Sequence, residues 1–278
     1  MYRSDLIKSH KVLCKVIEVI DKTFKFKVME AYVKIDKANN GLATIEFFHP
    51  KHNSLPSDIL SKLAQTITEA GADEEVKLIV LRSGGDRTFC SGASFTELIS
   101  INDLETGQKF FSGFANVINA CRKCPKLIIG RVQGKAVGGG VGVAAAVDYC
   151  MATKFASAKL SELNVGIGPF VVGPAVERKV GISAMSQMTI NADHFYPADW
   201  AKQKGLYADV FEDIDALDQG VQDLVDYLLS KNPEAQSMLK KVFWEGCENW
   251  DVLLAERAAL SGKLVLSEYT KEVLKGYA

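Results

Sequence analysis

Strand-like and helix-like patterns of apolar residues alternate along residues 31–205. Strands are predicted where apolar residues alternate with polar ones or form a short unbroken run, at residues 31–35, 42–48, 76–81 and 127–132. Asn40-Gly41, between the first two strands, is typical of a hairpin turn. Helices are predicted at residues 55–67, where an apolar side chain recurs at every fourth position, and at 110–120. Strands that alternate with helices predict an α/β fold.

After about residue 205 only helical spacing is found. Three helices are predicted there, at residues 217–228, after the capping sequence Asn232-Pro233-Glu234, and at residues 255–266. The sequence therefore predicts an α/β core at residues 29–205 and a helical C-terminal region at residues 206–278. Residues 1–28 have mixed charge and no turn signals, and we expect them to be an N-terminal extension, whose structure the sequence leaves open.

The composition is that of an average soluble globular protein, with 47% hydrophobic and 24% charged residues among 278. It excludes a disordered, collagen-like or disulfide-stapled chain. With 33 basic and 34 acidic side chains, the net charge of −1 gives no general electrostatic reason to bind nucleic acid or an acidic membrane surface. The longest apolar run, residues 136–147, has 12 residues, whereas a membrane-spanning helix needs about 20.

Six cysteines are scattered through a chain without a secretory signal pattern, which favours free thiols in the reducing cytoplasm. Cys121-Arg-Lys-Cys124 has the spacing of a zinc or redox pair. A zinc site needs a second pair of ligands, and the sequence offers neither another such pair nor two histidines at ligand spacing. We therefore expect these cysteines to be incidental to a helix, with no metal site.

Three segments have residues suited to chemistry. Residues 134–142 contain five glycines and run into a predicted helix, whose first N–H groups suit an anion or oxyanion. The loop at residues 87–94 has small residues after a predicted strand, where α/β folds bind ligands. Glu162 lies in a largely apolar stretch, and burial there would raise its pKa towards that of a general base. Each segment taken by itself has an alternative interpretation: close helix packing for residues 134–142, a surface turn for residues 87–94, and a solvated side chain for Glu162.

The order and spacing of these segments resemble the enoyl-CoA hydratase/isomerase (crotonase) superfamily over residues 29–278. The sequences that carry the resemblance are His49-Pro-Lys-His-Asn-Ser-Leu55, Phe89-Cys-Ser-Gly-Ala-Ser94, Val132-Gln-Gly-Lys-Ala-Val-Gly-Gly-Gly140, Val147-Asp-Tyr-Cys-Met-Ala152, Ser161-Glu-Leu-Asn-Val-Gly-Ile167 and Ala198-Asp-Trp-Ala-Lys-Gln-Lys-Gly-Leu206. The resemblance implies a crotonase-like spiral of ββα turns with a helical C-terminal subdomain that builds a homotrimer or a dimer of trimers. It also implies an acyl-CoA substrate, with coenzyme A present only as part of that substrate and no separate cofactor.

The resemblance assigns roles to particular residues. The backbone N–H groups of Ala93 and Gly139 would form an oxyanion hole for the thioester oxygen of an enolate. Glu162 would be the catalytic general base and acid. The resemblance implies contacts to substrate or CoA at Lys51, Ser91, Gly92, Phe95, Gly138, Gly140 and Phe170. We also expect acyl-pocket walls in residues 95–101 and at Phe110 and Phe111. The C-terminal residues Lys263, Tyr269 and Lys271 would lie over CoA bound to a neighbouring subunit.

One position departs from the family pattern. Hydratases of the family usually carry a second glutamate shortly after the triple glycine, and Gly142 stands there in this chain. A single glutamate at position 162 favours an isomerase that shifts a double bond from Δ3 to Δ2. The alternatives are a hydratase that works with one glutamate, an acyl-CoA thioesterase, and a non-catalytic acyl-CoA-binding relative. Ser94 also differs from the aspartate of many relatives.

Overall fold

The computed structural model describes residues 30–276 of the chain, so the predicted extension at residues 1–28 lies outside the described residues. The described residues from Ala31 onward form one compact unit. Its largest sheet has six strands, in the spatial order β1 (Tyr32–Lys37), β2 (Leu42–Phe48), β4 (Leu78–Ser83), β7 (Leu127–Val132), β9 (Tyr149–Thr153) and β12 (Asp209–Phe211). Only the β1–β2 hairpin is antiparallel, and the other neighbours are parallel.

Two smaller sheets lie beside the large one in the fold. The first has four strands, in the spatial order β11 (Tyr196–Pro197), β10 (Ser157–Lys159), β8 (Lys135–Val137) and β5 (Thr88–Cys90). The second pairs β3 (Ser54–Leu55) with β6 (Gly92–Ala93) in parallel. Three successive stretches of chain, β4–β5, β7–β8 and β9–β10, each add one strand to the large sheet and then one to the four-stranded sheet before a helix follows. This repeat is the spiral of ββα turns that the resemblance implied, and the expected α/β fold class is confirmed.

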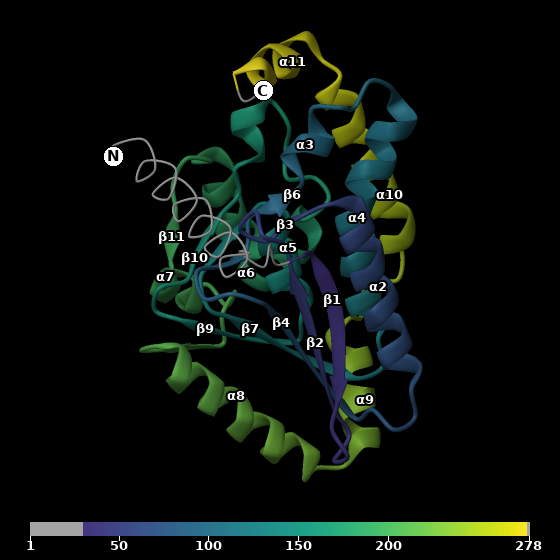
Figure 1. Ribbon diagram of the computed structural model, residues 1–278, viewed down its shortest axis with the longest axis vertical. Helices are drawn as coiled ribbons and strands as arrows, with labels where there is room; N and C mark the ends of the chain where they lie inside the picture. Colours follow the sequence, from purple (N-terminus) through teal and green to yellow (C-terminus); the bar gives the residue numbers. More distant parts are fainter. Residues whose placement is uncertain (1–29, 277–278) are drawn as a thin grey trace, which may run out of the picture. The chain divides into compact units, whose positions relative to one another are not determined.

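Helices surround the sheets (Figure 1). Those of the predicted core are α2 (Ser57–Ala72), α3 (Phe95–Leu98), α4 (Leu104–Lys123), α5 (Gly139–Ala146), α6 (Gly173–Ile190) and α7 (Ala198–Gln203), with the short 3-10 helix η1 (Glu162–Val165). The C-terminal helices are α8 (Ile214–Leu229), α9 (Pro233–Phe243), α10 (Trp250–Val265) and α11 (Glu268–Lys275). Helix α4 packs against both α2 and α10, while α8 packs on the large sheet through Leu217, Val221 and Val225.

The structure matches the predicted bounds of β2 and β7, where an apolar pattern is bounded on both sides by turn residues. It differs after residue 205, because β12 joins β9 at the edge of the large sheet and interrupts the helical pattern. Three residues are too few to give a strand pattern in the sequence. The predicted cap at the start of α9 is present, since the Asn232 side chain accepts a hydrogen bond from the Glu234 N–H at 2.9 Å.

Helix α9 is anchored to the core through a buried ion pair. The Lys240 ammonium group donates to Asp148 Oδ2 at 2.6 Å, and both side chains are at most 4% exposed. The Trp244 indole N–H and the backbone N–H of Ile128 also donate to this carboxylate. The Asp148 charge is therefore paired and hydrogen-bonded, which a buried charge requires. These contacts join the helical region to the α/β core through groups that lie far apart in the sequence.

The cysteines in the described part of the chain are all buried free thiols, and Cys121 and Cys124 lie at the C-terminal end of α4. Residues 30–276 contain no group of three histidine, cysteine, aspartate or glutamate side chains placed to hold a metal ion. Among these same residues, no helix combines the length and the apolarity that crossing a bilayer demands.

Candidate active site

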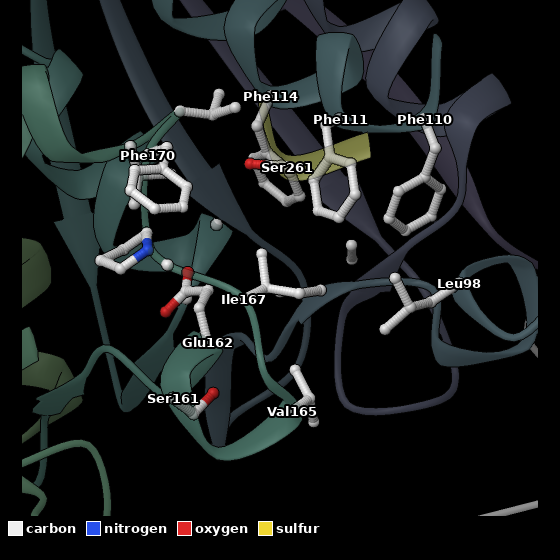
Figure 2. A pocket seen from close by; sticks show the side chains of 18 of the residues that line it. Leu98, Phe110, Phe111, Phe114, Ser161, Glu162, Val165, Ile167, Phe170 and Ser261 are labelled. Atoms are coloured by element: carbon white, nitrogen blue, oxygen red, sulfur yellow. The ribbon is translucent and has the colours of Figure 1, made fainter. Parts of the chain in front are cut away.

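A cavity of about 140 Å³ lies where several turns of the spiral meet the C-terminal helices (Figure 2). Its walls come from the segment β6–α3, from helix α4, from the start of α5, from η1 with the loop after it, and from α10. The lining residues are Ser91, Gly92, Ala93, Phe95, Leu98, Phe110, Phe111, Phe114, Gly138, Gly139, Ser161, Glu162, Val165, Ile167, Gly168, Pro169, Phe170, Val171, Val172 and Ser261. The wall is therefore almost entirely apolar, and within it Glu162 is the one ionisable side chain among the described residues.

The first helical residue of α5 lies directly in the cavity wall. Gly138 precedes the helix with φ 52° and ψ −117°, a conformation that other residues rarely adopt. Gly139 follows as the first residue of the helix, where N–H groups have no partner within the helix. A Cβ atom on Gly139 would lie 2.3 Å from the ring of Phe114, so only glycine lets this backbone approach the aromatic wall. The start of α5 thus presents backbone rather than side chain.

A second backbone segment reaches the same place. Strand β6, with Gly92 and Ala93, pairs with β3, and Gly92 has φ 93°. A Cβ atom on Gly92 would lie 3.7 Å from the backbone nitrogen of Gly139, so the two segments are close neighbours. The Asn53 side chain supports the preceding loop by donating to the carbonyl oxygens of Gly84 and Thr88. Two converging backbone segments at a helix start are suited to stabilising a developing oxyanion.

The Glu162 carboxylate lies against the same glycine turn. Its Oε1 is 3.0 Å from the position that a Cβ atom would take on Gly138, and its Oε2 is buried without a hydrogen-bond partner among the described residues. Glu162 as a whole residue is partly exposed, but its carboxyl end is turned into the cavity. Removal of this end from water raises the pKa of the carboxyl to about 7, which outweighs the opposite effect of a backbone hydrogen bond. A carboxyl group with a pKa near neutrality can both accept and return a proton at physiological pH.

The position of the missing second glutamate is filled by apolar side chains. A Cβ atom on Gly142 would lie 2.5 Å from Val172 Cγ1 and 3.5 Å from Ile118 Cδ1. Val172 lines the cavity, whereas Gly142 lies behind it and does not. A carboxylate at position 142 would therefore have to displace Val172 to reach the cavity.

Helix α11 of the same chain supports the loop that carries Glu162. The Thr270 hydroxyl donates to the carbonyl oxygen of Gly166 at 3.3 Å, and Thr270 is fully buried. Gly166 has φ 76°, and a Cβ atom there would lie 2.4 Å from Thr270 Oγ1. The C-terminal helix thus contacts η1 directly. The side chains of Lys263, Tyr269 and Lys271, which were expected to lie over CoA of a neighbouring subunit, are exposed.

The enoyl-CoA hydratase/isomerase family model matches residues 37–277, which is most of the chain. The chain belongs to this family. The short-chain-enoyl-CoA hydratase of Clostridium acetobutylicum is 27% identical over 239 residues, which cover 85% of the chain and 90% of that enzyme. The mitochondrial methylglutaconyl-CoA hydratase of Mus musculus is 29% identical over 200 residues, which cover 70% of the chain and 63% of that enzyme.

Isomerases also occur among the relatives, since the peroxisomal Delta(3,5)-Delta(2,4)-dienoyl-CoA isomerase of Arabidopsis thaliana is 27% identical over 209 residues, 69% of the chain and 73% of that enzyme. Among solved structures, an enoyl-CoA hydratase from Bacillus halodurans superposes with a TM-score of 0.81 at 19% identity, covering 88% of the chain and 99% of that structure. This likeness shows a shared crotonase fold.

Most of the site residues expected from the family resemblance meet in the cavity. Those that line it are Ser91, Gly92, Ala93, Phe95, Gly138, Gly139, Glu162 and Phe170. Lys51 lies outside the cavity lining, exposed on the turn before β3. Gly140 also lies outside the lining, because it packs against the main chain: a Cβ atom there would lie 2.4 Å from the carbonyl oxygen of Cys90. Ser94 caps α3 by accepting from the Glu97 N–H at 3.3 Å, a role that an aspartate would also fill.

Sequence reasoning missed several wall residues, of which Phe114, Val172 and Ser261 matter most here. Phe114 follows Phe110 by four positions, so the helical period of α4 was a usable signal. Val172 and Ser261 had no signal in the sequence, because the packing of α6 and α10 brings them to the cavity.

Proposed function

We propose that this protein is an enoyl-CoA isomerase that moves the double bond of a 3-enoyl-CoA from Δ3 to Δ2, with Glu162 as its general base and acid. The observation that carries the proposal is a single buried carboxyl group, of raised pKa, in an apolar cavity beside two converging backbone segments. The family membership supplies the acyl-CoA class of substrate.

The thioester oxygen of the substrate would bind at the N–H groups of Ala93 and Gly139. Removal of a proton from C2 places negative charge on this oxygen, and N–H groups directed at it stabilise the enolate more than the neutral thioester. Loss of one such donor costs about 3 kcal/mol of barrier in comparable sites. These donors belong to the backbone, so a side-chain substitution does not remove them.

The proton transfer needs only Glu162. Its carboxylate takes the proton from C2, the electron pair moves onto the thioester oxygen, and a dienolate forms. The resulting carboxylic acid gives the same proton to C4, and the electrons return to form the C2=C3 double bond. A carboxyl pKa of about 7 is matched to both halves of this cycle, because neither proton form is strongly favoured at neutral pH.

A hydratase is the second candidate, because the clostridial and mouse relatives bear hydratase names. Hydration of a 2-enoyl-CoA requires a water molecule that is held and activated while a proton is delivered to the α-carbon. In this chain Val172 and Ile118 occupy the space beside Gly142, which supports a reaction without a second carboxylate.

A two-substrate spectrophotometric assay tests the proposal. Absorbance of the conjugated enoyl thioester rises if a 3-enoyl-CoA is isomerised and falls if a 2-enoyl-CoA is hydrated. We expect the absorbance to rise with the first substrate. Glu162→Gln should lower the rate of this rise by about a hundredfold or more, since the amide keeps the shape of the side chain but cannot take the proton. Full activity of Glu162→Gln, or a fall with the second substrate as the faster reaction, contradicts the proposal. Release of free thiol would identify the thioesterase alternative, and no change with either substrate would identify an acyl-CoA-binding relative.

We extend the proposal to the assembly and location of the protein, as a cytoplasmic homotrimer or dimer of trimers. Helix α9 supports association, because Met238, Leu239, Val242 and Phe243 are each 47% or more exposed on it. Sedimentation equilibrium of the purified protein measures the subunit number directly, and a monomer would contradict this part of the proposal.

A further inference from the structure

The end of the cavity away from Glu162 is closed by an apolar cluster. Figure 2 shows Leu98 and Phe110 at the opposite end of the row of side chains from Glu162 and Phe170. Leu98 and Phe110 are each 7% exposed, and they pack in one cluster with Ile167, with Val265 of α10 and with Leu274 of α11. Phe95, which is 36% exposed, belongs to the more open part of the lining. The acyl chain of a substrate therefore meets a wall beyond the reacting carbons.

Two glycines determine how closely helix α10 packs against helix α4 at this end of the cavity. Helices α4 and α10 cross at Gly107 and Gly262, where a Cβ atom on Gly107 would lie 2.9 Å from the Cα atom of Gly262. A Cβ atom on Gly262 would in turn lie 2.7 Å from the backbone nitrogen of Gln108. This contact brings α10 close enough for Ser261 to line the cavity and for Val265 to pack on the cluster that contains Phe110. Larger residues at the crossing would separate the helices and lengthen the cavity.

The volume limits the size of the acyl group. A cavity of about 150 Å³ lined by leucine, isoleucine and phenylalanine holds one benzene molecule. The present cavity is similar in size, at about 140 Å³, and most of the side chains that line it are apolar. It therefore has room for an acyl group of about four to six carbons.

The charge of the lining limits which acyl groups the cavity can bind. Within the described residues, the cavity wall contains no lysine, arginine or histidine, and its only charge is that of Glu162. A carboxylate on the acyl chain would be buried without a cation and close to the like charge of Glu162, which disfavours binding.

We infer that the cavity selects short, uncharged acyl groups of about four to six carbons, and that Phe110, held by the Gly107–Gly262 crossing, sets the upper length. The inference rests on the proposed function for the orientation of the substrate, with its reacting carbons at Glu162.

Binding of saturated acyl-CoAs tests the inference without any need for turnover. We expect the affinity measured by calorimetry to rise about fourfold for each CH₂ from acetyl- to hexanoyl-CoA, the increment for burial of one CH₂, and to stop rising by decanoyl-CoA. Glutaryl-CoA, which carries a terminal carboxylate, should bind at least tenfold more weakly than butyryl-CoA. A rise that continues through decanoyl-CoA, or equal binding of glutaryl-CoA, overturns the inference.

Variants test which residue sets the length. Phe110→Ala should let the affinity keep rising beyond hexanoyl-CoA towards decanoyl-CoA, and Leu98→Ala is the second variant if the first does not fold. Phe155→Ala removes a phenyl ring that is 65% exposed and outside the cavity, so it should keep the wild-type profile. An unchanged profile in both cavity variants contradicts the role of this wall. If the length profile is as expected but no 3-enoyl-CoA is converted, the proposed isomerase activity fails and the selectivity stands.

Discussion

Because the Glu162 carboxyl is removed from water, we expect the free energy of unfolding to depend on pH, whether or not the protein is catalytically active. The folded protein holds this carboxyl with a pKa of about 7, well above the 4.5 of an unperturbed glutamate. A raised folded-state pKa means that the unfolded chain releases the proton more readily than the folded one. The contribution of Glu162 to the free energy of unfolding is therefore greatest below pH 4.5, and it decreases as the pH rises towards 7. One pKa unit corresponds to about 1.4 kcal/mol, so the full loss between these two pKa values is about 3–4 kcal/mol.

Glu162→Gln removes this titration while preserving the shape of the side chain. We expect the free energy of unfolding of the wild type, relative to the variant, to fall by about 2–3 kcal/mol between pH 5 and pH 8. Urea unfolding at one fixed protein concentration, repeated across this pH range, measures the difference. Glu212→Gln is the matched control, because its carboxylate is 80% exposed and should give little pH-dependent change. A wild-type-minus-variant difference that stays constant from pH 5 to pH 8 would refute the buried, proton-holding carboxyl.

Three further predictions concern the pH dependence of the rate, the space at position 142 and the buried ion pair of Asp148. The kcat/KM for a 3-enoyl-CoA should rise with pH to a plateau above about 7, because only the ionised Glu162 can take the C2 proton; a rate profile that is flat from pH 5.5 to 8.5 would contradict this. Gly142→Glu alone should not create hydratase activity, since Val172 Cγ1 lies 2.5 Å from the new Cβ position, and the double variant with Val172→Ala tests whether space is the obstacle. Asp148→Ala should lower the free energy of unfolding by about 3–5 kcal/mol, because it leaves the buried Lys240 ammonium unpaired, and adding Lys240→Met should recover part of the loss in urea unfolding.

The strands and helices with strong local patterns could be predicted from the sequence. Residues 42–48 and 127–132 form strands with the predicted bounds, because each is a short, largely apolar run that is mostly buried in the sheet and has turn residues at both ends. The glycine segment at residues 134–142 contains the predicted start of helix α5, since a glycine in an unusual backbone conformation precedes it. Strand β12 was missed because three residues gain their pairing from β9, which lies more than fifty positions earlier in the chain.

The candidate site divides in the same way. The sequence by itself determined which chemical groups this chain carries: one glutamate in an apolar loop, a glycine-rich helix start, and no second carboxylate at position 142. Only the tertiary structure decided what those groups touch. Gly139 lies in the cavity wall while Gly140 packs against the carbonyl oxygen of Cys90, although the two are neighbours in the chain. Burial, and with it the raised pKa of Glu162 and the size of the acyl cavity, depends on residues brought together from distant segments, and no local pattern records those contacts.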